Sequence, residues 1–246
     1  MASPRDRFLT IYGRRPVLEA LADESLTVDK VVLDERGRGP ELAEIERVAR
    51  RRGVDVRRAS AADVTRLSRN GRQDQGVAAD VIAPSMRSLE DFEPATSSRV
   101  LVLDGITNPA NVGQILRTTV ASGFDGIVVP TAGVADIGPL VVKASAGYAF
   151  RAPILRARTA ADAVDALRDG HGFRIYGLDS RGGRSLFDDA APFAGRSAFV
   201  LGGEHEGLSV SVHETVGIPM TSDVDSINVA AAAAVLCFEL VRRDRC

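Results

Sequence analysis

Three stretches of this sequence place polar side chains directly after a short apolar run. They are LDGITNPANVGQILRTT (103–119), FVLGGEHEGLS (199–209) and IPMTSDVDSINVAAAAA (218–234). Each apolar run predicts a strand, and in parallel α/β sheets ligands bind beyond the carboxyl ends of the strands. The polar residues of the three stretches are therefore the candidates for chemistry.

In the first stretch, Asn108 and Pro109 have the form of a helix start, with Asn as the N-cap and Pro at the first helical position. Asn111 lies in the predicted first turn, where free backbone N–H groups attract anions. Arg117 follows less than two turns later. This spacing fits an anionic substrate, such as a phosphate, bound by Arg117 with Asn111 fixing the geometry. An ordinary capped helix with one exposed arginine fits the same spacing.

In the second stretch, Gly202 and Gly203 allow a backbone to approach a ligand closely, and Glu204 places a carboxylate at the end of a strand. Gly207 permits a tight turn. A glycine-rich turn with one acid is common in proteins, so this stretch alone identifies no reaction. The chain has no G-x-G-x-x-G in a strand–turn–helix setting, which argues against a Rossmann dinucleotide site.

The third stretch ends in five consecutive alanines, residues 230–234. Alanine is the best helix former but buries little apolar area, so packing alone seldom calls for five in a row. Ser226 is a candidate N-cap for this helix, and Asn228 would then be a polar group in its first turn. A plain capped helix does not explain the alanines.

The three stretches must be held in place by the helices and strands around them, which the sequence predicts as follows. Residues 1–83 predict a compact α/β domain, with helices at 15–21, 40–52 and 60–69 and strands at 30–33, 54–57 and 76–82. Residues 84–98 are rich in Pro, Ser and charge and are expected to be a linker. Residues 99–246 predict apolar strands at 100–104, 126–130, 173–179, 197–203 and 216–220, which alternate with helices at 108–122, 139–146, 160–168 and 226–242. This alternation predicts a parallel sheet covered on both faces.

The composition is that of an ordinary soluble globular protein, with 246 residues, 45% hydrophobic and 26% charged content, and a net charge of −2. Only Lys30 and Lys143 are lysines, so nearly all the positive charge is arginine, whose planar group suits phosphate. The arginines clustered between Arg47 and Arg58 fit either a phosphate-binding patch or a solvated helix face. The scattered Cys and His residues have no metal-ligand spacing, and no apolar run is long enough to span a bilayer. We therefore expect no metal and a cytoplasmic location.

Taken together and in this order, the three stretches resemble the TrmH (SpoU) family of RNA 2′-O-ribose methyltransferases, within the SPOUT superfamily. NPANVGQILRT (108–118) is similar to the first family motif, GGEHEGL (202–208) to the second and IPMTSDVDSINVAAAAA to the third. IYGRRPVLEAL (11–21) and RQDQGVAADV (72–81) resemble the L30e-like RNA-binding domain found in many members. The second motif has His205 where a small residue is usual, and Ile227 replaces the commoner Leu.

The resemblance implies an α/β fold in two parts. The first is a small N-terminal L30e-like domain, and the second is a C-terminal parallel sheet whose chain forms a deep trefoil knot. The resemblance also implies a homodimer that binds RNA and uses S-adenosylmethionine as methyl donor, without a metal. In such a knot, the alanines of the last helix would let the backbones and the donor approach closely.

The resemblance further implies roles for particular residues. The catalytic residues would be Asn111, Arg117, Glu204, Ser226 and Asn228. The methyl donor would be held by Leu201, Gly202, Gly207, Ile218, Met220 and Ile227. Arg117, helped by a substrate phosphate, would lower the cost of deprotonating the ribose 2′-hydroxyl, which then attacks the methyl group.

The expected reaction is methylation of a guanosine ribose in 23S ribosomal RNA. Methylation of tRNA, or of an antibiotic-resistance site in ribosomal RNA, stays open because such relatives share the core motifs. From another class, a non-catalytic RNA-binding or ribosome-assembly protein could keep the same fold. The intact set of catalytic residues argues for an enzyme.

Overall fold

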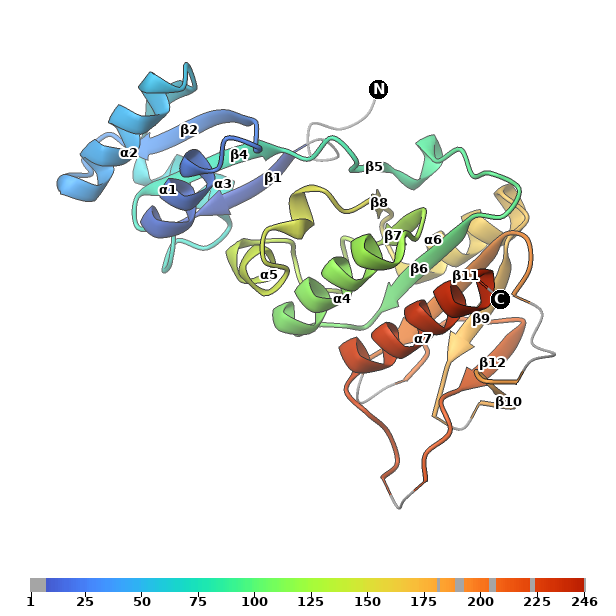
Figure 1. Ribbon diagram of the computed structural model, residues 1–246. Helices are drawn as coiled ribbons and strands as arrows, with labels where there is room; N and C mark the ends of the chain where they lie inside the picture. Colours follow the sequence, from blue (N-terminus) through green and yellow to red (C-terminus); the bar gives the residue numbers. More distant parts are fainter. Residues whose placement is uncertain (1–7, 181, 189–192, 204–206, 222–223, 246) are drawn as a thin grey trace. The chain divides into compact units, whose positions relative to one another are not determined.

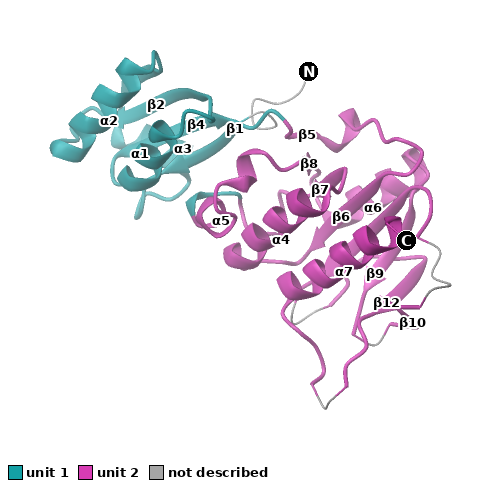
Figure 2. Ribbon diagram, viewed as in Figure 1, with its two compact units in different colours: residues 1, 3–84, 137–139 teal, residues 2, 85–136, 140–246 magenta. Residues whose placement is uncertain are grey.

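The computed structural model describes residues 8–180, 182–188, 193–203, 207–221 and 224–245. The described residues form two compact units (Figure 2). The first unit holds the residues up to 84 together with 137–139, and the second holds 85–136 and the described residues from 140 onwards. Each unit is built on a sheet of its own.

The first unit is a four-stranded sheet in the order β1-β4-β2-β3. β4 runs antiparallel to both β1 and β2, and β2 runs parallel to β3. The strands are β1 (Phe8–Tyr12), β2 (Val28–Asp34), β3 (Asp55–Ala59) and β4 (Val77–Ile82), and the helices are α1 (Arg14–Ala22), α2 (Pro40–Arg51) and α3 (Ala61–Ser68). The predicted N-cap of α3 is confirmed, since the Oγ of Ser60 accepts a hydrogen bond from the backbone N–H of Asp63.

The arginine cluster lies on α2, just after it and on β3, and most of its side chains have partners within the unit. Arg47 pairs with Glu44, and both Arg50 and Arg58 pair with Glu46. Arg52 donates hydrogen bonds to four carbonyl oxygens at and after the end of α1, those of Ala20, Leu21, Asp23 and Leu26. Arg52 therefore satisfies carbonyl groups that the helix end leaves without intrahelical partners. The ion pairs favour the solvated-face interpretation for Arg47 and Arg50.

The second unit contains an eight-stranded sheet in the order β10-β12-β9-β11-β6-β7-β8-β5. Every neighbouring pair is parallel, which confirms the predicted parallel sheet. The strands are β5 (Arg87–Ser88), β6 (Arg99–Asp104), β7 (Gly126–Val128), β8 (Ile154–Arg156), β9 (Arg174–Leu178), β10 (Arg184–Ser185), β11 (Ser197–Gly202) and β12 (Glu214–Gly217). Tyr176, Phe199 and Leu101 are fully buried in the central strands, which explains why these strands read as continuous apolar runs.

Helices cover both faces of this sheet (Figure 1). On one face, α6 (Ala160–Asp165) and the π-helical turn that continues it (Ala166–Gly170) pack Val164 and Leu167 against Val100 and Val200. On the other face, α4 (Pro109–Ser122) packs beside α7 (Val229–Asp244). The remaining helices are α5 (Pro139–Ala144) and two 3-10 turns, Leu89–Asp91 and Tyr148–Phe150. None of the helices that the structure describes is both long and apolar enough to cross a membrane.

The segment expected to be a linker, 84–98, is partly built into the second unit. Its short strand β5 pairs with β8, and its Leu89 and Phe92 are buried in the core that α6 covers. These apolar side chains are spaced three apart in an otherwise polar segment, so they are easily missed in the composition. β1, β8 and β10 are likewise not among the predicted strands, and β8 and β10 are short.

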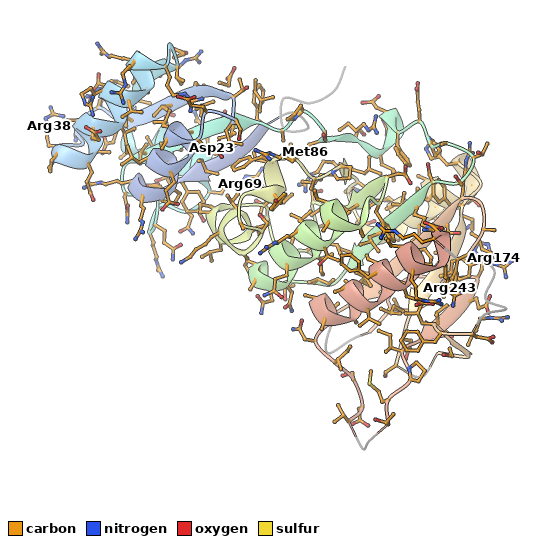
Figure 3. The ribbon with its side chains drawn as sticks, in the orientation of Figure 1. Asp23, Arg38, Arg69, Met86, Arg174 and Arg243 are labelled. Carbon is orange, nitrogen blue, oxygen red and sulfur yellow. The ribbon has the colours of Figure 1, made fainter. Side chains whose placement is uncertain are left out.

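Glu239 on α7 is a buried carboxylate held by two arginines. Its oxygens accept hydrogen bonds from Arg242 and from Arg243 (labelled in Figure 3). Arg243 also donates to the carbonyl oxygens of Leu186 and Asp188, and so ties α7 to the segment that follows β10. Hydrogen bonding from Arg242, with the further help of Arg243, lowers the pKa of Glu239 to about 2 although burial opposes this shift.

The Glu239 cluster is expected to make stability fall in acid. A glutamate in the unfolded chain has a pKa of roughly 4.3, well above that of folded Glu239. As the pH falls between these two values, the unfolded chain takes up a proton that the folded chain does not, so acidification favours unfolding. Glu239→Gln should therefore lower the urea midpoint at pH 7 and lose less stability than wild type between pH 5 and pH 3. The exposed Glu90→Gln is the control, and equal pH dependence in Glu239→Gln and wild type would contradict the prediction.

Candidate active site

The first predicted stretch begins at the carboxyl end of β6. Asn108 is the N-cap of α4, as predicted, and its side chain accepts a hydrogen bond from the backbone N–H of Ala110. Asn111, in the first turn of α4, is buried, with 5% of its surface exposed. A buried amide keeps its place only when its polar atoms are hydrogen-bonded.

Asn111 is joined to the third stretch by a side-chain hydrogen bond. The Nδ2 of Asn228 donates to the Oδ1 of Asn111 at 3.0 Å. Asn228 is itself the N-cap of α7, because its Oδ1 accepts from the backbone N–H groups of Ala230 and Ala231. The prediction that Ser226 caps this helix is therefore wrong. Asn228 both caps α7 and contacts α4, so the N-cap lies two residues later than predicted.

The second stretch is held to β6 through a buried carboxylate. Asp104 ends β6 with only 4% of its surface exposed, and its two oxygens accept hydrogen bonds from the backbone N–H and the Oγ of Ser209. β11 lies beside β6, so this contact fixes the loop that follows β11 at the same edge of the sheet.

The glycines of the second stretch bring backbone segments into direct contact. A Cβ atom on Gly202 would lie 2.4 Å from the carbonyl carbon and oxygen of Gly207. A Cβ atom on Gly203 would lie 2.6 Å from the carbonyl oxygen of Gly105. Gly207 has a φ of 67°, a left-handed conformation that favours glycine. This packing leaves no room for a side chain at Gly202 or Gly203.

A cavity of about 280 Å³, here called the Ile218 cavity, lies where the second and third stretches meet. Its lining includes Leu201, Gly202, Gly207, Ile218, Met220 and Ile227, which are the six residues assigned to the methyl donor by resemblance. Ser226 also lines it, together with Leu178, Asp179 and Ser180 from the end of β9 and Ala232 from α7. Most of the lining residues are apolar or glycine, while Asp179, Ser180, Ser226 and the backbone present polar groups.

A second and larger cavity, here called the Asn111 cavity, has a volume of about 630 Å³. Its described lining comes from the segments after β6, β7, β8 and β11 and from the first turns of α4, α6 and α7, and includes Asp104, Thr107, Asn108, Asn111, Ala132 and Thr159. Gly203, Gly207 and Val229 line both cavities, so the two share a wall. The Asn111–Asn228 hydrogen bond lies beside this wall, because Val229 follows Asn228 in the chain.

Of the five residues predicted to be catalytic, Arg117 is not gathered at these cavities and Glu204 has no described position. Arg117 is exposed on α4, and it is not part of the described lining of either cavity. Among the described residues, no carboxylate forms an ion pair with Arg117. Glu204 lies outside the described residues, as does His205, so the structure gives no position for either.

Two acidic residues at strand ends, Asp104 and Asp179, line the cavities but are not among the predicted site residues. Asp104 lines the Asn111 cavity and Asp179 lines the Ile218 cavity. Asp104 ends β6, and Asp179 immediately follows β9, in each case directly after a leucine. A Leu-Asp pair at the carboxyl end of an apolar strand was therefore an available signal for both.

The alanine run serves both packing and the cavity. Ala230 and Ala233 are buried in α7, which packs beside α4. Ala232 faces the other way and lines the Ile218 cavity. Small side chains thus let α7 lie close to α4 on one side and to the cavity on another.

The chemistry available here is hydrogen bonding and positioning. Burial raises the pKa of Cys237 to about 12, so this α7 thiol offers no thiolate nucleophile at neutral pH. Nowhere in the described ranges do three or more His, Cys, Asp or Glu residues gather as metal ligands would. Amide side chains, glycine backbone and apolar walls suit the binding of an organic ligand whose own reactive group does the chemistry.

Comparisons with known proteins agree on one family. Residues 98–238 match the profile of the SpoU rRNA Methylase family, and residues 10–86 match a profile described as RNA 2′-O ribose methyltransferase substrate binding. A 23S rRNA (guanosine-2′-O-)-methyltransferase RlmB from Xanthomonas campestris is 34% identical over 95% of this chain and 96% of that protein. A protein of the same name from Xylella fastidiosa is 33% identical over the same shares.

A solved structure has the same arrangement. The crystal structure of the SpoU methyltransferase AviRb from Streptomyces viridochromogenes, in complex with the cofactor AdoMet, superposes with a TM-score of 0.66 at 25% identity. The superposition covers 98% of this chain and 92% of the AviRb chain.

Proposed function

The chain belongs to the SpoU rRNA methylase family, and on that premise we propose that it transfers a methyl group from S-adenosylmethionine to a ribose 2′-hydroxyl of RNA. The relatives named RlmB support 23S ribosomal RNA as the substrate and a guanosine as the target. The profile match of residues 10–86 supports RNA binding by the first unit. The domains are then 1–83 for RNA binding, 84–98 as the connection and 99–246 for methyl transfer.

The observation that carries the proposal is the lining of the Ile218 cavity. Residues at or after the ends of β9, β11 and β12 contribute to it together with α7, and it includes all six residues that the resemblance assigns to the donor. Apolar walls fit the adenine ring, while exposed backbone at the glycines offers hydrogen-bonding groups at short range. Gly202 lies so close to the backbone of Gly207 that a side chain at this position would clash with it and distort the cavity wall. The residues present therefore fit S-adenosylmethionine, whose sulfonium supplies an activated methyl group when it is bound.

The chain's own groups would position and polarise the acceptor. In this proposal Asn111 and Asn228, fixed by their mutual hydrogen bond, orient the ribose beside the wall shared by the two cavities. Arg117 and a substrate phosphate would favour loss of the 2′-hydroxyl proton to solvent, and the 2′-oxygen would then take the methyl group that the bound donor supplies as its sulfonium becomes a neutral thioether. Ser226 and Glu204 complete the proposed catalytic set. We assign no metal to the reaction.

The proposal includes the trefoil knot and the homodimer expected of the family. The knot is supported by the lining of the Ile218 cavity, where Ile218 and Ile227 of the third stretch lie beside Leu201 and Gly202 of β11. α7 then packs beside α4, the first helix of the second unit. A dimer would bring the exposed Arg117 of each protomer into a surface that two chains build together.

The proposed function predicts that removing the gene abolishes one 2′-O-methyl group in the cell's RNA. Methylation of total RNA from cells with and without the protein should differ at a guanosine of 23S ribosomal RNA. Purified protein should restore that modification on RNA from the deletion strain when S-adenosylmethionine is added. If the missing 2′-O-methyl group is instead in tRNA, the substrate is tRNA and not ribosomal RNA. Identical maps, together with no transfer by the purified protein, would favour a non-catalytic RNA-binding protein.

A further inference from the structure

Of the six residues assigned to the methyl donor, only Gly207 lines the larger of the two cavities. We propose that the Asn111 cavity receives the base of the target nucleotide after it leaves the RNA stack, and that its carboxylate selects guanine. This inference rests on the proposed function, since it concerns the acceptor of the same reaction.

The position of the cavity fits an acceptor. It shares Gly203, Gly207 and Val229 with the Ile218 cavity, so a nucleoside in one would lie next to a donor in the other. A base on the far side of the wall would place its ribose beside Asn111 and Asn228, which are hydrogen-bonded to each other there. A pocket that holds an extruded base, as base-flipping enzymes provide, offsets part of the unstacking cost and fixes the position of the attached ribose.

The charge of the lining argues for a base and against a phosphate. No arginine or lysine is among the described residues that line the Asn111 cavity, whereas Asp104 brings a carboxylate. Thr107, Asn108 and Thr159 add uncharged hydrogen-bonding side chains. A phosphate beside Asp104 would be repelled without a compensating cation, while a neutral base with N–H donors would be attracted.

Asp104 has the capacity to bind such donors. Each of its oxygens accepts one hydrogen bond from Ser209, at 2.6 Å from the backbone N–H and 2.7 Å from Oγ. An ionised carboxylate has about four lone-pair positions, so each oxygen can accept once more. Guanine presents two adjacent donors, N1–H and the 2-amino group, which match the two oxygens of a carboxylate. Adenine has an unprotonated N1 at the same edge, which a carboxylate disfavours.

Filling the cavity tests the proposal. Ala132 and Ala161 both line it and are exposed, so a phenylalanine at either position enters open space without crowding the core. Ala95 is an exposed alanine of the same unit that is not part of the described lining of either cavity, and Ala95→Phe is the matched control. Each variant is compared with wild type for thermal unfolding, for S-adenosylmethionine affinity and for single-turnover methyl transfer to RNA from the deletion strain.

A second readout uses free nucleosides and is independent of catalysis. Saturation-transfer NMR with guanosine, and separately with adenosine, is recorded on the protein saturated with S-adenosylhomocysteine. Wild type and Ala95→Phe should show transfer to the guanine H8 and much less to adenosine. Ala132→Phe and Ala161→Phe should lose the guanosine signal and slow methyl transfer at least about 100-fold, with donor affinity within about twofold of wild type.

The outcomes separate this inference from the proposed function. A wild type that transfers no methyl group but shows guanosine transfer that Ala132→Phe and Ala161→Phe abolish would refute the function and keep the pocket. Methyl transfer at the wild-type rate in both filled variants would overturn the pocket alone. Weaker S-adenosylmethionine binding in both filled variants would also overturn it, because the cavity would then belong to the donor. Equal NMR signals for guanosine and adenosine would refute the selection by Asp104.

Discussion

Arg117→Ala is expected to slow methyl transfer about 10²- to 10³-fold, the usual cost of removing one group that stabilises charge in a transition state. Arg117 is exposed on α4, outside the described lining of either cavity, and no described carboxylate pairs with it. Neither the fold nor the donor cavity depends on its guanidinium for packing. The variant should therefore unfold at the wild-type temperature and bind S-adenosylmethionine with wild-type affinity while kcat falls.

The matched controls for Arg117 change one property at a time. Arg117→Lys keeps a positive charge but loses the planar, bidentate group, and should recover only part of the rate. Arg245→Ala removes another exposed arginine of the same unit, at the end of α7, and should leave the rate unchanged. Methyl transfer at the wild-type rate in Arg117→Ala would remove Arg117 from the catalytic set. A proportional loss in Arg245→Ala would show that the rate follows general RNA attraction and not one guanidinium.

The parallel sheet could be predicted from the sequence because the pattern that indicates it lies within each short segment of the chain. Strand segments such as 100–103 are apolar at every position, which only a sheet buried on both faces tolerates, and the helices between them are amphipathic or capped. The weakest predictions concern short or tertiary features. β10 spans only Arg184–Ser185, and β5 only Arg87–Ser88, so neither is long enough to show a period.

The start of α7 shows why local rules fail near a site. Ser226 and Asn228 are both good N-cap residues, and propensity cannot choose between them. Asn228 is the N-cap, and its side chain also hydrogen-bonds Asn111, which lies more than a hundred residues earlier in the chain. Asp104 is a similar case, because its carboxylate is held by hydrogen bonds from Ser209, about a hundred residues later in the chain. Residues that join distant stretches are visible only when the stretches are seen together.

The gathering of the donor-cavity residues was anticipated by motif resemblance and not by periodicity. Periodicity predicted strand ends and a capped helix, and it gave no reason for Gly202, Ile218 and Ile227 to line one cavity. The backbone contact between Gly202 and Gly207 gives the physical reason for the glycines. It also leads to the second large effect, because a glycine that is needed for space cannot be replaced even by alanine.

Gly202→Ala is expected to abolish donor binding in the accessible concentration range. Its Cβ would lie 2.4 Å from the carbonyl carbon and oxygen of Gly207 and 2.9 Å from the backbone nitrogen of Leu208. These are backbone atoms, so the clash can be relieved only by moving the loop that forms one wall of the Ile218 cavity. Overpacking of this kind typically costs about 1–3 kcal/mol of stability. S-adenosylmethionine affinity by calorimetry and urea unfolding of each variant measure the two effects separately.

Gly170→Ala is the matched control, because nothing lies within 4 Å of a Cβ atom there and its backbone needs no left-handed conformation. It should bind the donor like wild type and change stability by less than about 1 kcal/mol. A Gly202→Ala protein that is folded and binds the donor with wild-type affinity would show that the Ile218 cavity is not the donor site. A folded Gly202→Ala protein that has lost donor binding but still binds RNA would instead show that the two ligands are held by separate parts of the chain. The second result follows if residues 10–86 bind RNA while the contact between Gly202 and Gly207 shapes only the donor cavity.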